Sequence, residues 1–437
     1  MVLMDNFRVA SSVVTLILLM LLPLAILGIL YFGISYRPSK YGGSSYTSGF
    51  SSTIIPRNLT YTSNWSTWGR GGSTAPRPMG SAELLEEAER LCWKFMGSKM
   101  ISSEGAVYST LRRGYGGSRD YGVNHEVTAE SIGLLMSYAV DVGDKPLFDR
   151  EVLFLEEKLL SPLGICYWKL GEDLSPYMDG GYASSASIDD LRIVEALIDG
   201  YDQWGDERYI RLAHLMMDGI YLYEVDEATG ILLDYYTWRD GRGDKAEALT
   251  LSYAVLPSLL KMGRLDERWV RVFNETLRVV LEGSGSQGLF HSRYIVGDRR
   301  YVDGPADAIT ELTVALNLAD VGEEGRAATV FRFFRDDYLE RGFISDLYTP
   351  SGMGSQSDAG VGAYSLLARL ALKMGDRSLA LKVIYEKILA VQDKDPCSSY
   401  YGAFMNQWPT DRLEANAYDN LQALLTLREA VEALRQP

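Results

Sequence analysis

The sequence of 437 residues predicts an all-α fold, an (α/α)6 toroid of six inner and six outer helices, which follows a transmembrane segment and a linker. The main observation is an internal repeat, in which an apolar run, a glycine turn and a more charged amphipathic run follow one another. The turn glycines lie 62, 58, 59 and 53 residues apart, at Gly143, Gly205, Gly263, Gly322 and Gly375. A second observation is a run from Val9 to Tyr36 that carries no charge.

The N-terminal segment is long enough to cross a bilayer as a helix. Residues 1–8 form a short flank, and residues 9–36 are predicted to anchor the chain in the lipid bilayer. The apolar run exceeds the core of a signal peptide, and no clear cleavage site follows it, so an uncleaved anchor is favoured over a cleaved signal. Arg8 before the run and Arg37 with Lys40 after it mildly favour the opposite orientation.

Residues 37–80 are rich in Ser, Gly and Tyr and have no helical period, which predicts a flexible linker. Asn58 and Asn64 lie in this linker in Asn-x-Ser/Thr sequons, and Asn274 lies in a third sequon further along the chain. Two glycosylation sequons in a stalk just after a membrane span favour an extracellular position for the stalk and the body that follows it. We therefore expect a single-pass protein of the cell membrane, with the body, residues 81–437, on the extracellular side.

The repeats define the helices of the body. An apolar helix is typical of an inner position and a one-sided helix of an outer position, and glycine is suited to the left-handed cap between them. The first outer helix is expected at 81–96. The inner helices are expected to start near Glu130, Asp189, Ala248, Asp307, Asp358 and Glu414. An open helical solenoid is the alternative to a closed ring.

The connections from outer to inner helices are long, which is usual where loops carry function. In a toroid they all lie at one end, above the N-termini of the inner helices. Aromatic rings with polar tips gather there and suit sugar rings, although each alone can also be ordinary loop packing. They are Trp168, Tyr177, Tyr182, Tyr235, Tyr236, Trp238, Tyr294, Tyr301, Tyr348, Tyr400, Tyr401 and Trp408.

Charge and composition argue against several classes of partner and cofactor. Residues 81–437 hold 37 basic and 57 acidic residues, a net charge of −20, so nucleic acid is not expected as a partner. The chain has three His, none at ligand spacing to another, so we expect no metal site and no cofactor. Cys92, Cys166 and Cys397 permit one disulfide and one free thiol, and the sequence does not choose the pair.

Acidic residues recur at the starts of the inner helices. Capping and the helix dipole account for most carboxylates at such positions. Two of them facing each other across a cleft would instead have the arrangement of an inverting glycosidase, in which one carboxyl protonates the leaving oxygen and the other activates water.

Two segments resemble the family 8 glycoside hydrolases. Residues 128–136, TAESIGLLM, with the following VGDKPLFD, resemble the family's acid motif, and Glu130 falls on the general acid. Residues 186–197, ASIDDLRIVEAL, are similar to its Ala-Ser-Asp-Ala-Asp-x-x-Ile-Ala helix, and Asp190 falls on the second Asp. The first Asp, which belongs to the sugar-binding centre, falls on Ile188, with Asp189 beside it. Either Asp189 substitutes for it or the subsite differs.

The resemblance continues along the body. Residues 251–257, LSYAVLP, are similar to the family's Pro-Ser-Tyr-x-x-Pro and contain Tyr253. Residues 301–311, YVDGPADAITE, occupy the place of the base motif, where Asp307 is the best match. The family's Arg is replaced there, so Asp303 and Asp358 are alternative bases. No motif is intact, and the chain looks like a divergent relative.

This resemblance implies a hydrolase that inverts a glycosidic bond of a polysaccharide or surface glycan. Together with the predicted anchor, it gives a membrane-tethered extracellular enzyme. Glu130 would be the acid, Asp307 the base, and Asp190 would hold the sugar. The residues expected to bind substrate are Asp189, Tyr182, Trp238, Tyr253, Tyr301 and Trp408. A non-catalytic glycan-binding protein on the same toroid is one alternative. A lyase or epimerase that uses His125 or His291 is the other.

Overall fold

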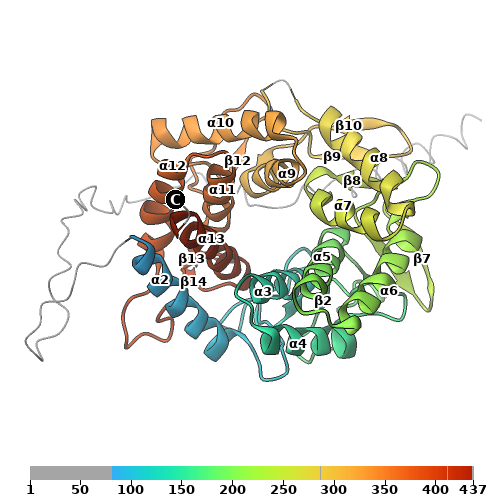
Figure 1. Cartoon of the computed structure of the whole chain (residues 1–437), viewed down its shortest axis with the longest axis horizontal. Helices are drawn as coiled ribbons and strands as arrows, with labels where there is room; N and C mark the ends of the chain where they lie inside the picture. Colours follow the sequence, from blue (N-terminus) through green and yellow to red (C-terminus); the bar gives the residue numbers. More distant parts are fainter. Residues whose placement is uncertain (1–80, 286, 411, 436–437) are drawn as a thin grey trace, which may run out of the picture. The chain divides into compact units, whose positions relative to one another are not determined.

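The computed structural model describes residues 81–285, 287–410 and 412–435. In this part of the chain, six inner helices stand in a ring and six outer helices surround them (Figure 1). The inner helices are α3 (Ala129–Asp141), α5 (Ser187–Trp204), α7 (Leu256–Leu265), α9 (Ala308–Asp320), α11 (Val361–Lys373) and α13 (Ala417–Arg435). The outer helices are α2 (Ser81–Phe95), α4 (Lys145–Phe154), α6 (Glu207–Tyr223), α8 (Arg268–Glu282), α10 (Glu324–Arg341) and α12 (Arg377–Val383).

The ring is closed. Each inner helix packs against the next, and α13 packs back against α3. The first outer helix, α2, covers the last inner helix, α13, so the two ends of the body meet at one seam (Figure 1). The closed toroid predicted from the repeat is therefore confirmed, and the open solenoid is not found.

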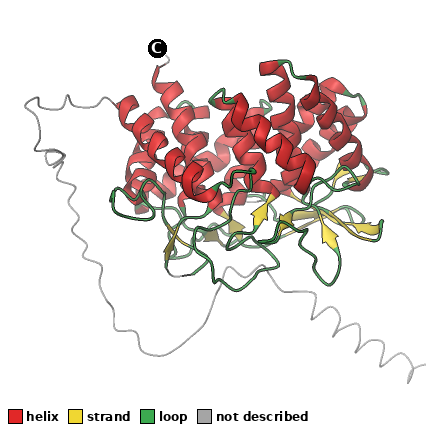
Figure 2. Cartoon of the chain, turned by 90° about the horizontal axis from the view of Figure 1, so that it is seen from below, coloured by secondary structure: helices red, strands yellow, loops and turns green. Residues whose placement is uncertain are grey.

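The strands are short and lie with the long loops at one end of the ring (Figure 2). The strands are β1 (Val127–Thr128), β2 (Lys169–Leu170), β3 (Ala183–Ser184), β4 (Val225–Asp226), β5 (Ile231–Leu232), β6 (Tyr236–Arg239), β7 (Arg242–Lys245), β8 (Ala248–Thr250), β9 (Arg293–Ile295), β10 (Arg300–Val302), β11 (Ala306–Asp307), β12 (Leu347–Tyr348), β13 (Asn406–Gln407) and β14 (Leu413–Glu414). All pair antiparallel, within single loops or between neighbouring ones, as when β1 pairs with β2 and β11 with β12. Because β1 and β11 lead directly into α3 and α9, this end holds the N-termini of the inner helices.

The third repeat differs from the prediction. Residues 248–250 form strand β8, which pairs with β9, and α7 begins only at Leu256. Pro257 explains the late start, because proline is tolerated in the first turn of a helix but breaks its interior. Gly263 lies inside α7, whereas the other four turn glycines have the predicted positive φ. Helices α11 and α13 begin at Val361 and Ala417, about a turn after the predicted starts.

Several predictions about the N-terminal part lie outside the described residues, namely the anchor at 9–36, the linker at 37–80, and the sequons at Asn58 and Asn64. Within the described part, no helix is both long and apolar enough to cross a membrane. Asn274 is exposed on α8, but the Thr276 of its sequon is fully buried and accepts a hydrogen bond from the Leu232 amide (3.2 Å). All three cysteines are free thiols; Cys92 and Cys166 are buried and Cys397 is exposed.

Candidate active site

Glu130 lies in the first turn of α3, at the loop end of the ring. Thr128 caps this helix, because its hydroxyl accepts the Ser131 amide (3.3 Å). The cap leaves the Glu130 side chain free to reach the neighbouring helix α5, where Arg192 donates from Nη1 to Glu130 Oε1 (2.9 Å). The candidate acid and the second inner helix are therefore joined by an ion pair.

Asp189 faces Glu130, whereas Asp190 faces the interior. Asp189 is 6% exposed, and its Oδ1 lies 3.6 Å from Arg192 Nη1, one turn along the same face of α5. Burial first and the negative charge of Glu130 next raise the pKa of Asp189 well above its ordinary value, and the charge of Arg192 opposes this. Asp190 is fully buried and accepts the Cys166 amide (2.8 Å). Of the two aspartates, Asp189 is therefore the one that shares the site of Glu130.

Asp307 caps α9 on the other side of the ring. Its Oδ1 accepts the Thr310 amide (3.0 Å), which is the ordinary capping bond. Burial raises the pKa of Asp307, the amides of Thr310 and Ile309 lower it, and the charge of Asp346 raises it further. One turn along, the buried Glu311 accepts the Phe290 amide (2.9 Å), and burial raises its pKa to about 8. Asp307 is thus a carboxylate in a partly dry position, with a second buried carboxyl beside it.

Tyr418 is a further buried group at this end of the ring. It is the second residue of α13, and its buried hydroxyl has no hydrogen-bond partner among the described residues. Burial raises the pKa of Tyr418 most, followed by the charge of Glu130, with Asp307 among the further contributors, while Arg192 lowers it.

Tyr253 completes this group from the 3-10 turn before α7. Burial raises the pKa of its phenol, and the charges of Asp234, Asp189 and Glu130 raise it further. Asp307 lies at the start of α9 at the loop end of the ring, and contacts or charges link Glu130, Asp189, Tyr253, Tyr418 and Arg192. The last two were missed in the sequence. Tyr418 lies four residues after Glu414, the predicted start of the last inner helix, whereas no local sequence signal identifies Arg192.

Comparisons with known proteins identify the family of this chain. The family model described as glycosyl hydrolases family 8 matches residues 86–405. The chain belongs to this family. It is therefore a glycoside hydrolase, with a carbohydrate as its substrate.

Among curated proteins, this family 8 chain is 25% identical to the "putative lipoprotein YdaJ" of Bacillus subtilis over 319 residues, 71% of this chain and 81% of that protein. Its fold is shared with a structure described as a novel alpha-amylase from Clostridium perfringens (24% identity, TM-score 0.70, 81% of this chain and 99% of that one). It is also shared with the family 8 endoglucanase Cel10 from Klebsiella pneumoniae (16% identity, TM-score 0.55, 78% and 99%).

The two alternative bases of the family 8 chain lie in different surroundings. The side chain of Asp303 is 71% exposed and bonds to His291 Nδ1 (2.5 Å). Asp358 is paired with Lys387 (2.9 Å) and accepts the Tyr364 hydroxyl. Both are occupied by partners of their own.

The aromatic residues predicted to bind substrate differ in exposure. Tyr182 is 47% exposed, whereas Trp238 is 7% exposed and packs against Tyr167 and Tyr236. Trp408 meets the exposed Tyr121 edge-on (centroids 5.1 Å apart). Tyr182 and Trp408 are therefore available at the surface of the loop end, and Trp238 supports the loops from within.

Tyr301 is half-buried, donates to the Val279 carbonyl (2.7 Å) and stacks on His291. No group of three or more His, Cys, Asp and Glu in the described part is arranged to hold a metal ion.

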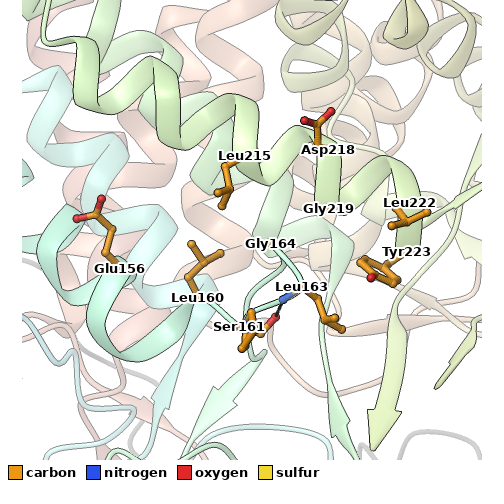
Figure 3. A pocket seen from close by; sticks show the side chains of 11 residues that line it. Glu156, Leu160, Ser161, Leu163, Gly164, Leu215, Asp218, Gly219, Leu222 and Tyr223 are labelled. Carbon is orange, nitrogen blue, oxygen red and sulfur yellow. Dashed lines mark hydrogen bonds between the residues drawn. The ribbon is translucent and has the colours of Figure 1, made fainter. Parts of the chain in front are cut away.

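A hollow of about 730 Å³ lies on the outer wall rather than in this site (Figure 3). It is lined by residues 160–164 and by outer helix α6, including Leu215, Leu222 and Tyr223. Its two acidic side chains are both paired with arginines, Glu156 with Arg208 and Asp218 with Arg268. No inner helix contributes to it, so we place the candidate chemistry at the loop end of the ring.

Proposed function

We propose that this family 8 glycoside hydrolase cleaves a polysaccharide or surface glycan with inversion at the anomeric carbon. Glu130 is the general acid, Asp307 is the general base that activates water, and Asp189 holds the sugar at the point of cleavage. The observation that carries the proposal is the position of Glu130 and Asp307, which both lie at the starts of inner helices at the loop end of the ring. The family 8 match over residues 86–405 includes both residues.

The surroundings of Asp307 suit a general base. Its cap bond uses Oδ1, so Oδ2 remains for a water molecule. A carboxylate whose pKa is raised by burial accepts a proton more readily than an exposed one, which favours removal of a proton from water. The paired Asp358 and the exposed Asp303 lack this combination of burial and a free oxygen.

The surroundings of Glu130 suit a residue that finishes the reaction as a carboxylate. Once the proton has passed to the leaving oxygen, Glu130 carries a negative charge. Arg192, at 2.9 Å, is in position to neutralise it. Asp189 shares the same arginine, so the sugar-holding group and the acid are held at a fixed spacing.

Hydrolysis of a substrate panel tests this assignment. The panel contains mixed-linkage β-glucan, carboxymethyl cellulose, xylan and amylose, so that α- and β-linked polymers are both represented. Glu130→Gln and Asp307→Asn are each expected to lower kcat by about 10²–10⁴-fold on the polymer that is cleaved. Asp358→Asn is the matched control, since it removes a carboxylate from the loop just before another inner helix, α11. Hydrolysis that survives both Glu130→Gln and Asp307→Asn would refute the assignment.

We further propose that residues 9–36 anchor the enzyme in the cell membrane and that the body faces outside. The uncharged run and the sequons at Asn58 and Asn64 support this, as does the similarity to a protein described as a putative lipoprotein. Protease added to intact cells is expected to release the body into the medium. A body that stays protected until the cells are lysed would reverse the orientation.

A further inference from the structure

Two fully buried carboxyls lie behind the site, and no catalytic step uses them. Asp190 is in the first turn of α5 and Glu224 caps the C-terminus of α6. Each has one satisfied oxygen: Asp190 Oδ1 accepts the Cys166 amide (2.8 Å), and Glu224 Oε1 accepts the Ser185 hydroxyl. The other two oxygens, Asp190 Oδ2 and Glu224 Oε2, find no N–H or hydroxyl donor in the described part.

Both carboxyls lie at the start of α5, because Glu224 is bonded to Ser185 just before this helix and Asp190 lies in its first turn. Burial is the first cause that raises the pKa of both residues, and the negative charge of Asp190 adds to the shift of Glu224. Two ionised carboxylates without a donor between them would repel each other. One shared proton supplies the missing donor and leaves one negative charge on the pair instead of two.

The segment held by this pair lies between the two halves of the site. Trp168 donates its amide to the Ser184 carbonyl (2.9 Å), just before α5, and its carbonyl accepts the Ala129 amide (2.9 Å), at the start of α3. Cys166, two residues earlier, is the residue that Asp190 holds. Residues 166–168 therefore bridge the first turns that carry Glu130 and Asp189.

We propose that Asp190 and Glu224 form a proton-sharing carboxyl pair that fixes residues 166–168 between α3 and α5, and that both are positioning residues for Glu130 and Asp189. This rests on the function proposed above only in its last step, since the fixing of the segment is independent of catalysis. Loss of the shared proton leaves two repelling carboxylates in the interior, which loosens the segment and changes the spacing of the two site residues.

The charged and titratable neighbours of the pair are consistent with this assignment. On α5, Asp189 adds a negative charge that acts on Glu224, and on the loop the buried Cys166 thiol is a hydrogen-bond partner that lowers the pKa of Asp190. Lys245 of β7 lies near the end of α6, but its ammonium donates to the Val225 carbonyl (2.7 Å). The thiol and the ammonium leave both negative charges in place, so a shared proton is the group that removes one of them.

The cysteines provide a direct readout. Cys166 is buried beside the pair, Cys92 is buried against Asn420 at the seam between α2 and α13, and Cys397 is exposed. We would label the full-length protein with iodoacetamide over about pH 5 to 9 and quantify each cysteine by peptide mass spectrometry. Cys92 corrects for the general rise in thiolate with pH. Burial and then the charges of Asp190 and Glu224 raise the pKa of the Cys166 thiol, so loss of the shared proton alone would lower the ratio of Cys166 to Cys92 labelling, and a ratio that rises with pH reports opening of the segment.

In the wild type, the ratio is expected to rise with pH, by up to about tenfold per pH unit while the pair loses its proton. Glu224→Gln keeps an oxygen for Ser185 and offers a permanent N–H to Asp190, so its ratio is expected to stay flat. Asp190→Asn is a second variant with the same expectation. Glu151→Gln is the matched control, because Glu151 is also fully buried with one unpaired oxygen but lies on outer helix α4.

Kinetics on the polysaccharide cleaved in the panel test the positioning step. At alkaline pH, KM of the wild type is expected to rise by about tenfold relative to Glu224→Gln. The pH dependence of kcat, which the catalytic carboxyls determine, is expected to be the same in both enzymes. A ratio that is flat in the wild type, or that rises equally in Glu224→Gln, would overturn the proposal. So would a pH dependence of KM that is the same in both enzymes. If no polymer is cleaved, the hydrolase assignment fails, and the labelling ratio still decides whether the pair fixes the segment.

Discussion

Replacement of Lys169 by Met should cost the enzyme a large share of its stability. Lys169 is fully buried, and its ammonium donates to the carbonyls of Ser118 (2.6 Å) and Tyr121 (3.2 Å) and to Glu126 Oε2 (3.2 Å). Removal of one partner of a buried ion pair costs about 3–5 kcal/mol, because the other charge stays buried. The two carbonyls belong to a more exposed segment and can bind water instead, so we expect a loss near the lower limit, about 3 kcal/mol.

Denaturant unfolding of single and double variants measures this loss. Glu126→Gln alone, and Lys169→Met with Glu126→Gln, complete a double-mutant cycle with Lys169→Met. The double variant is expected to recover at least about 1 kcal/mol of the loss, since it no longer buries an unpaired carboxylate. A loss below about 1 kcal/mol for Lys169→Met, or strict additivity of the two changes, would refute the reasoning.

Three further predictions concern the site. Asp307→Asn should keep the unfolding free energy within about 0.5 kcal/mol, since Asn caps a helix as well as Asp does, while kcat falls by about 10²–10⁴-fold; an unchanged kcat would assign Asp307 to capping alone. Tyr418→Phe should leave stability unchanged or slightly higher, because the hydroxyl has no protein partner, and lower kcat/KM by about tenfold; unchanged kinetics would remove Tyr418 from the site. Glu311 is buried with a raised pKa of about 8, so its neutral form is favoured by folding. Its stabilising contribution is full below about pH 4 and is lost as the pH rises towards 8, and Glu311→Gln should flatten the pH dependence of unfolding over that range; an unchanged slope would contradict the assignment.

The period of the repeat predicts the ring, because buried helices appear in the sequence as apolar runs and their caps appear as glycines. Gly143 and Gly205 take the left-handed conformation expected of them, and the apolar runs before them become inner helices. The third repeat shows where such a pattern fails. Pro257 was a visible signal for a late helix start, but the apolar residues of β8 fit a helix period as well as a strand.

The composition of the site was only partly predictable. Glu130 and Asp307 stand out because each lies at the start of an inner helix and falls on a motif. Which of Asp189 and Asp190 faces Glu130 depends on the rotation of α5 about its axis, and a shift of one residue turns a side chain by about 100°. Arg192 was missed for the same reason, since its pairing with Glu130 joins two helices and has no spacing in the sequence that would reveal it.

The configuration of the first product tests the central claim most directly. Proton NMR of the reducing end, recorded during the first turnovers of the wild-type enzyme on the polymer it cleaves, distinguishes the two anomers before they interconvert. Two carboxylates that act as acid and base on opposite faces of the sugar give an inverted product, and this is the result we predict for Glu130 and Asp307. A product that retains the configuration of the cleaved bond would show that one carboxylate is a nucleophile, and would contradict the roles assigned to both.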